Sequence, residues 1–322
     1  MLSLQLREKG KVLEKQDDIS KISDYIVDPT NIVWVDALSP DAQEMELLAC
    51  EFGFHPLSIE DYYTPHPRPK VDVYPNYYFI VVHALEFSVE TSDLIPVELV
   101  LFLGANYIVT VHREPMGILD HVCDIWKREP RLLNDGSGML LYDILDGLVD
   151  SYFPILDEVD DRIDQIEDDI FGHGHVASVE STFRLKRSLL ILRRITAPLR
   201  DVLNTLIRRD QPLLSDQSVI YLRDIYDHTL RITDTVDTYR DILTGALDAY
   251  LTVISNQMNA VMKTLTVVTT ILVSMQVISG IYGMNFLNMP ELHWRFGYPL
   301  AIGFMVLSSL GLLHYFKRIK WL

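Results

Sequence analysis

The stretch Tyr282-Gly283-Met284-Asn285-Phe286 lies near the end of the first of two long apolar runs in the C-terminal part of the sequence. The first run, residues 264–289, contains no Asp, Glu, Lys, Arg or His, and the second, residues 296–316, contains no Asp, Glu, Lys or Arg. A helix of about 20 apolar residues crosses the roughly 30 Å hydrocarbon core of a bilayer. Each run is therefore predicted to span a membrane, and the turn between them is expected on one side of it.

The positions of the positively charged residues predict on which side of the membrane the termini and the turn lie. Lys317, Arg318 and Lys320 directly follow the second run, Lys263 precedes the first, and the intervening loop carries no net charge. Lys and Arg are in excess at the cytoplasmic ends of membrane helices. The N-terminus has no apolar core of signal-peptide length. We expect a multi-pass protein of the cell (inner) membrane with both termini in the cytoplasm.

Composition narrows the possible ligands. The 322 residues carry a formal net charge of -17, which argues against a nucleic-acid partner, because such a partner needs a basic face. An acidic excess fits solubility and equally fits cations as ligands. Cys50 and Cys123 form no CxxC pair, so neither a disulfide framework nor a zinc site is expected.

Residues 1–138 are predicted to form a cytoplasmic α/β domain. The predicted strands, rich in Val, Ile, Tyr and Phe, are residues 2–6, 32–35, 77–85, 97–103 and 107–111. Ser39 as a cap, Pro40 at the first helical position and Gly53 at the end predict a helix between Ser39 and Gly53. Three prolines in five positions predict a loop over residues 62–69.

The remainder is predicted to be helical. Residues 139–212 are predicted to contain two helices. The first, over 139–170, is acidic and kinked at Pro154, and the second, over 179–209, is basic. Opposite charge favours pairing of the two as a hairpin, and the alternative is an acidic surface that attracts ions. No proline occurs from residue 213 to residue 289, which predicts one long helix. The expected segments are a cytoplasmic stalk (213–261), a first membrane helix (262–282), an external loop (283–296), a second membrane helix (297–316) and a basic cytoplasmic tail (317–322).

A stripe of mostly polar residues follows the long helix at alternating steps of three and four. It consists of Asp224, Asp227, Arg231, Asp234, Thr238, Asp241, Gly245, Asp248, Thr252, Ser255, Asn259, Met262, Thr266, Thr269, Val273, Gln276, Gly280 and Gly283. A period of 3.5 residues keeps such a stripe on one face of a supercoiled helix. In the stalk, a face of the helix exposed to solvent explains the polar stripe. Inside a membrane that explanation does not hold, so Thr266, Thr269 and Gln276 are expected to face protein or water. Because one helix cannot enclose a pore, we expect a symmetric oligomer with the stripe facing its axis.

These residues resemble the CorA family of magnesium channels. Residues 283–285 carry the family's GMN signature, and Met289-Pro290-Glu291-Leu292 follow it as in many members. Similar segments occur at residues 55–61, 68–71, 142–153, 221–228 and 320–322, so the resemblance covers nearly the whole chain.

The resemblance implies a funnel-shaped homopentamer, in which each subunit has an α/β cytoplasmic domain, a long α-helical stalk and two C-terminal transmembrane helices. It implies passive flow of Mg²⁺, with Co²⁺ or Ni²⁺ also accepted, driven by the membrane potential. The implied partners are metal ions, the lipid bilayer and further copies of the chain. No organic cofactor and no enzymatic activity are expected.

The resemblance also implies roles for individual residues along the pore. Gly283, Met284 and Asn285 would form an entry filter that binds hydrated Mg²⁺ through its waters, and the alternative is that they form only a tight turn. The positions that match the family's pore are Asp248, Asn259, Met262, Leu265, Thr269, Val273 and Gln276. Met262 and Leu265 resemble a hydrophobic gate, for which ordinary helix packing is the alternative.

A regulatory metal site is implied in the cytoplasmic part. Asp224, with Asp227 and His228 close by, matches a region that binds cytosolic Mg²⁺ between neighbouring subunits, and Asp146 matches a second such site. An acid from the neighbouring α/β domain is expected to complete the first site. Because Ser88 stands at the aligned position, the candidates are Glu86, Glu90 and Asp93.

The implied basic ring consists of Lys317, Arg318 and Lys320. These residues would surround the stalk just below the membrane, either fixing topology through lipid headgroups or taking part in gating.

The alternative functions are a zinc transporter, a membrane-tethered enzyme and a structural tether or receptor. Zinc transporters of the ZntB type share the architecture but often vary the middle residue of the signature, and Met284 favours CorA. The sequence contains no P-loop, GxGxxG, GxSxG or HExxH motif, and His173 with His175 is a poor catalytic pair, which disfavours a membrane-tethered enzyme. A structural tether or receptor has no need of Gln276 inside a membrane.

Overall fold

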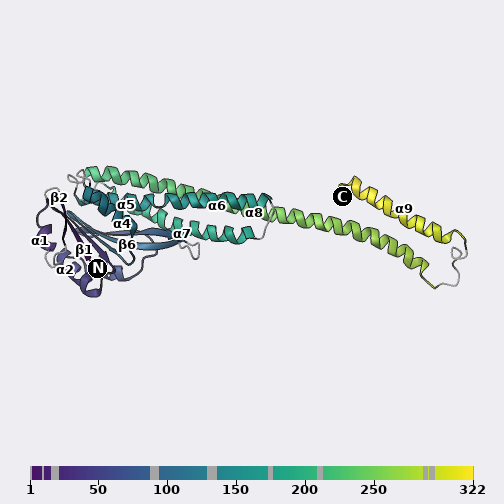
Figure 1. Cartoon of the computed structure of the whole chain (residues 1–322), viewed down its shortest axis with the longest axis horizontal. Helices are drawn as coiled ribbons and strands as arrows, with labels where there is room; N and C mark the ends of the chain where they lie inside the picture. Colours follow the sequence, from purple (N-terminus) through teal and green to yellow (C-terminus); the bar gives the residue numbers. More distant parts are fainter. Residues whose placement is uncertain are drawn as a thin grey trace. The chain divides into compact units, whose positions relative to one another are not determined.

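The computed structural model of the chain describes residues 2–8, 11–15, 22–87, 94–128, 136–172, 177–208, 213–285, 289 and 294–321 (Figure 1). The chain divides into two compact units, one made of Met1–Asp169 with Val176–Gly245, the other of Ile170–His175 with Ala246–Leu322. The long helix α8 (Asp216–Tyr282) contributes to both units.

The first unit is built on a seven-stranded sheet of strand order β2-β1-β3-β7-β6-β5-β4. Its strands are β1 (Leu2–Glu8), β2 (Lys11–Lys15), β3 (Ile32–Leu38), β4 (Lys70–Val73), β5 (Tyr77–Phe87), β6 (Leu94–Gly104) and β7 (Tyr107–His112). β5, β6 and β7 form an antiparallel meander in which Phe102 lies opposite Phe79 on one side and Val109 on the other. β3 pairs with β7 in parallel, with Val35 opposite Val109.

All five strands predicted from the sequence are confirmed, and β2 and β4 are additional. Both additional strands are short and rich in charged residues, which are depleted in strands, so local pattern does not reveal them. Each pairs antiparallel with a strand that local pattern does predict, β2 with β1 and β4 with β5.

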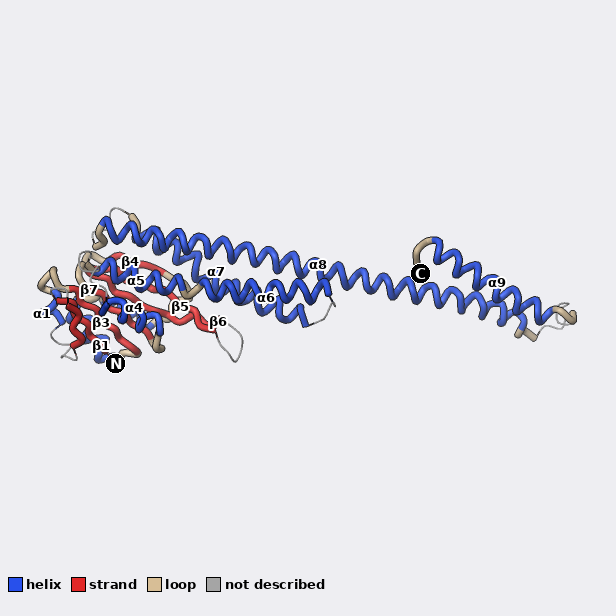
Figure 2. Tube along the Cα trace, turned by 45° about the horizontal axis from the view of Figure 1, so that its top comes forward, coloured by secondary structure: helices blue, strands red, loops and turns tan. Residues whose placement is uncertain are grey.

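Helices cover both faces of this sheet (Figure 2). α1 (Ile22–Ile26), α2 (Ala42–Phe52) and α3 (Pro56–Tyr63) lie on one face, where Val33 and Val35 of β3 share a core with Leu48 of α2. α4 (Gly117–Arg128), α5 (Ser137–Asp150) and α7 (Ala177–Leu206) lie on the other. There Trp34, which alternates with Val33 and Val35, meets Trp126 of α4 edge to face, with ring centroids 5.8 Å apart. The domain is therefore a three-layer α/β/α sandwich.

The start of α2 corrects the sequence prediction. Ser39 has a φ of 45° and lies outside the helix, so neither it nor Pro40 begins α2. Asp41 is the N-cap instead, because its carboxylate accepts two backbone N–H groups of the first turn while the Glu44 carboxylate accepts the N–H of Asp41 at 3.0 Å. The predicted end is confirmed, since Gly53 adopts the left-handed conformation with φ 67°.

Residues 139–170 form two helices rather than one kinked helix. α5 ends at Asp150, and α6 (Phe153–Gly172) begins at Phe153. Pro154 lacks a backbone N–H and fits the first turn of a helix, so it marks a start instead of a kink. Between the two helices the fully buried Tyr152 hydroxyl donates to the carbonyl oxygen of His83 at 2.5 Å, which fixes the break against β5.

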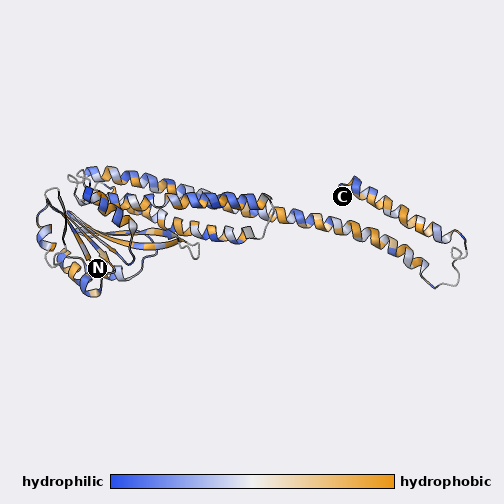
Figure 3. Cartoon of the chain, viewed as in Figure 1, coloured by the Kyte–Doolittle hydropathy of each residue, from blue (hydrophilic) through white to orange (hydrophobic). Residues whose placement is uncertain are grey.

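The second unit contains the C-terminal part of α8 and the helix α9 (Gly297–Arg318). Both α8 and α9 include a window long and apolar enough to cross a membrane, in agreement with the two predicted spans. Figure 3 shows hydrophobic residues concentrated along α9 and along the C-terminal part of α8.

Candidate ion pathway and metal site

Five of the predicted pore positions of α8 lie on the face opposite Val267. Val267 is only 2% exposed, and α9 is the other long helix of this unit, from which we infer that α9 covers the face that carries Val267. At about 100° per residue, five of the predicted pore positions point within about 60° of the opposite direction. These are Met262, Leu265, Thr269, Val273 and Gln276, and all five are exposed. Asn259 and Asp248, further toward the stalk, are exposed as well.

The threonine hydroxyls of the stripe are satisfied within α8. Thr266 donates to the carbonyl oxygen of Met262 at 2.7 Å, and Thr269 donates to that of Leu265 at 2.8 Å. Such bonds also let threonine face lipid, so these two hydroxyls alone do not require protein or water around them. Gln276 differs, because a side-chain amide offers two donors and two acceptor lone pairs and the described residues give it no partner.

The signature residues continue the last turn of α8. The N–H of Gly283 donates to the carbonyl oxygen of Ser279 at 3.0 Å, and that of Met284 to the carbonyl oxygen of Ile281 at 3.3 Å. Gly283 has no positive φ, so a left-handed turn does not explain its presence. A Cβ there would lie 3.3 Å from the oxygen of Ser279. Asn285 follows with an exposed side chain, and Phe286 lies outside the described residues.

A candidate metal site lies between α5 and α8 in the first unit. Asp146, Asp150 and His228 place one ligand atom each within 4.8 Å of one another. Asp224 stands one turn before His228, with its Oδ2 4.0 Å from Nε2 of that ring. The site is fixed by aromatic contacts between the same helices, Tyr142 with Tyr221 at 5.1 Å between ring centroids among them.

The electrostatics of this cluster favour a cation. Burial, followed by the charge of Asp150, raises the pKa of Asp146, while a hydrogen bond from Tyr142 and the His228 ring act in the opposite direction. Burial and the nearby carboxylates raise the pKa of Tyr142 to about 12. Carboxylate oxygens suit Mg²⁺, and an added imidazole nitrogen suits Co²⁺ or Ni²⁺. A divalent ion would therefore offset the repulsion between Asp146, Asp150 and Asp224.

Only some of the predicted regulatory residues lie close together in the structure. Asp227 lies about 100° around α8 from His228 and lines a different surface, with Arg231 and Asp234. Glu86 ends up exposed near the end of β5 and is not part of the cluster, while Glu90 and Asp93 lie outside the described residues. Asp150 was not singled out as a ligand, although its position four residues after Asp146 places both on one helical face.

The predicted basic residues stand at a well-defined helix end. Lys317 and Arg318 occupy the last turn of α9, and all three basic side chains are exposed. Lys320 adopts a positive φ of 58°, which brings the Trp321 ring onto Phe316 with centroids 5.8 Å apart. Cations at this end also complement the helix dipole.

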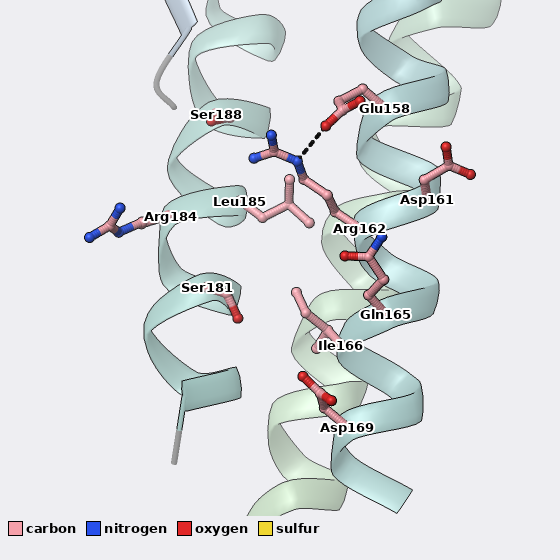
Figure 4. Close-up of a pocket in the computed structure, with 10 residues that line it drawn as sticks. All are labelled: Glu158, Asp161, Arg162, Gln165, Ile166, Asp169, Ser181, Arg184, Leu185 and Ser188. Carbon is pink, nitrogen blue, oxygen red and sulfur yellow. Dashed lines mark hydrogen bonds and ion pairs between the residues drawn. The ribbon is translucent and has the colours of Figure 1, made fainter. Parts of the chain in front are cut away.

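Apolar side chains lie between α6 and α7, the two helices whose opposite charges predict a hairpin. Figure 4 shows Arg162 bonded to Glu158 within α6 and Arg184 directed away from α6, while Leu185 and Ile166 extend between the helices. Both apolar side chains are buried. Among the described residues, the ion pair that leaves α7 is directed to α8.

The chain is similar to proteins of a known transporter family over most of its length. The family described as CorA-like Mg²⁺ transporter protein matches residues 30–318. The cobalt/magnesium transport protein CorA of Thermotoga maritima is 41% identical over 277 residues, covering 84% of this chain and 78% of that protein.

Solved structures show the same fold. The complete structure of the CorA magnesium transporter from Methanocaldococcus jannaschii matches with a TM-score of 0.86 and 25% identity, covering 100% of this chain and 99% of that one. The ZntB cytoplasmic domain from Vibrio parahaemolyticus matches with a TM-score of 0.64 and 10% identity, over 79% of this chain and 98% of that one. At this low identity the ZntB likeness concerns the fold alone.

Proposed function

The chain belongs to the CorA-like Mg²⁺ transporter family, and from this membership we propose that it carries Mg²⁺, and also Co²⁺ or Ni²⁺, across the cell (inner) membrane. Proteins of this family are transport channels, so the chain is not an enzyme. The observation that carries the proposal is the family match over residues 30–318, together with the signature at the end of a membrane-spanning helix.

The proposed topology places residues 262–282 and 297–316 in the membrane, the loop 283–296 outside and both termini in the cytoplasm. The basic side chains at the end of α9 support this orientation. A divalent cation that enters then gains roughly 4.6 kcal/mol per 100 mV of membrane potential, twice the single-charge value.

The proposed pore runs along the axis of a homopentamer. Placing α9 on the outside leaves the exposed stripe of α8 to face the axis, where Gln276 meets water and other copies of itself. Met262 and Leu265, both more than half exposed in the single chain, would form an apolar collar that blocks ions by dewetting.

The proposed filter consists of Gly283, Met284 and Asn285. Mg²⁺ gives up its water reluctantly, so a ring of Asn285 amides and backbone carbonyls would hold the hydrated ion through its waters. Gly283 supports this role, because the missing side chain leaves the backbone at the mouth open to an ion.

The proposed sensor is the cluster of Asp146, Asp150, Asp224 and His228. Cytosolic Mg²⁺ bound there would offset the repulsion between acids and stabilise the closed state, and its loss would shift the population toward the open one. An acid from a neighbouring subunit, for which Glu86, Glu90 and Asp93 are candidates, would complete the site.

A zinc transporter is the competing function, because the ZntB domain shares the fold. Uptake into liposomes that contain the purified protein, measured for Mg²⁺, Co²⁺, Ni²⁺ and Zn²⁺, tests the proposal. Uptake of Mg²⁺ and Co²⁺ driven by an inside-negative potential is expected. Uptake of Zn²⁺ with none of Mg²⁺ would overturn it.

A further inference from the structure

A pocket of about 450 Å³ lies in the first unit, between the loop before β4 and α7. Its lining residues are Arg68, Leu190, Arg193, Arg194, Ala197 and Pro198. Three of the six are arginines and none is acidic. In a chain whose net charge is -17, such a local excess of positive charge favours an anion.

Helix α7 supplies one wall. Leu190, Arg193, Arg194 and Ala197 follow the spacing i, i+3, i+4, i+7, which places them on one helical face. Leu190 and Ala197 supply the apolar part of this wall. Arg193 is held in place by an ion pair with Asp237 on α8, in which its Nε lies 2.6 Å from Oδ1.

The loop supplies the opposite wall. Arg68 stands between Pro67 and Pro69, whose fixed φ angles reduce the backbone freedom of the segment. The loop is anchored at its start, where the N–H of His66 donates to Oε2 of Glu98 at 2.7 Å. The backbone that carries Arg68 is therefore largely ordered before a ligand arrives, which lowers the entropic cost of binding.

Two of the three guanidinium groups, those of Arg68 and Arg194, have no ion-pair partner among the described residues. Arg193 keeps further N–H donors beyond those directed at Asp237. Each guanidinium can therefore still donate to an oxygen anion.

We propose that this pocket binds an anion that bears phosphate groups. The planar guanidinium fork matches phosphate oxygens bidentately, and three forks suit two linked phosphates better than one. The volume lies within the range of small-molecule sites. Among the described residues, no aromatic side chain lines the pocket to hold a base. The diphosphate is the recognised group, and a nucleotide and inorganic pyrophosphate bind alike.

Calorimetric titration of the full-length protein in detergent, in metal-free buffer, tests this inference. Pyrophosphate and ATP are expected to compete for one site per chain. Arg68→Gln and Arg194→Gln are each expected to weaken binding by about ten-fold or more, through loss of charge-assisted hydrogen bonds. Arg187→Gln is the matched control, because it removes the same charge from an exposed position of α7 outside the pocket.

A parallel arm uses vesicles of phosphatidic acid in phosphatidylcholine. Phosphatidic acid carries a single phosphate, so binding to these vesicles without binding of pyrophosphate or ATP would overturn the assignment to a diphosphate. Thermal unfolding of each variant shows that it is folded. The proposal is overturned if no probe binds at millimolar concentration, or if Arg187→Gln weakens binding as much as Arg194→Gln.

Discussion

Asp146 on α5 and His228 on α8 bring their ligand atoms within 4.8 Å of each other, although the two residues are far apart in the sequence. Asp150 completes the group, and Asp224 lies 4.0 Å from the same imidazole. The helices thus hold several acids together at the cost of mutual repulsion. A bound cation relieves that repulsion, which is the property that a metal sensor requires.

The first prediction concerns this cluster. Asp146→Asn is expected to weaken Co²⁺ binding by about ten-fold, because the site loses a charged ligand. The same change is expected to raise the metal-free melting temperature, because the carboxylates repel one another less. Melting of the purified protein across a Co²⁺ titration measures both effects. Asp161→Asn, which removes an acid from α6 outside the cluster, is the control, and equal behaviour of the two variants would refute the assignment.

The second prediction concerns the gate. Met262→Gly is expected to raise Mg²⁺ leak through the closed state, because it opens the apolar collar. Val261→Gly costs α8 a similar amount of helix stability, about 1 kcal/mol, but points about 100° away. Flux into liposomes at millimolar internal Mg²⁺ compares them. If both variants leak equally, helix destabilisation is the cause and Met262 has no role in gating.

The third prediction concerns His112 of β7, which is buried with both ring nitrogens facing acceptors. Nε2 lies 3.1 Å from Oδ1 of Asp36, and Nδ1 lies 2.6 Å from the carbonyl oxygen of Glu114. Burial lowers the pKa of His112, but these hydrogen bonds and the charges of Asp36 on β3 and Asp120 on α4 outweigh burial, so the pKa is raised. At a given pH, a larger fraction of His112 rings than of ordinary histidines therefore carries both protons.

A raised pKa stabilises the fold most at a pH below the ordinary histidine value of about 6.5, and this contribution is lost as pH rises through the folded-state pKa. His112→Gln is expected to lower the melting temperature at about pH 6, and the deficit is expected to shrink toward about pH 8. The exposed His121→Gln on α4 is the control. A deficit that does not change with pH would contradict a charged His112.

Much of the fold follows from local pattern. The proline-free run predicts α8, and the two charge-free runs predict both membrane spans, because neither depends on distant contacts. The break between α5 and α6 is harder to predict from local pattern, because it is fixed by the hydrogen bond from the Tyr152 hydroxyl to the carbonyl oxygen of His83 in β5. The N-cap of α2 is predicted at the wrong residue for another reason. The correct one could be read from the sequence, because Asp41 and Glu44 have the spacing of a capping box.

The site is predicted less completely, and the reason is geometric. Helical spacing places Asp224 and His228 together, and equally Asp146 and Asp150, but only tertiary packing shows that the two pairs meet. The same spacing groups Asp227 with Asp224, yet the packing of α8 leaves Asp227 on another surface. In the membrane stripe, the hydroxyls of Thr266 and Thr269 have partners within α8, so Gln276 gives the stronger indication of a water-facing or protein-facing side.

In the proposed pore, Asn285 selects the ion at the mouth. Potential-driven Mg²⁺ uptake into liposomes by the wild-type protein and by Asn285→Ala tests this role, with equal amounts of correctly assembled oligomer verified by size-exclusion chromatography. We expect uptake by the wild type and a loss of at least about ten-fold in the variant, because the amide that holds the hydrated ion is gone. Wild-type flux through an intact Asn285→Ala oligomer would contradict it.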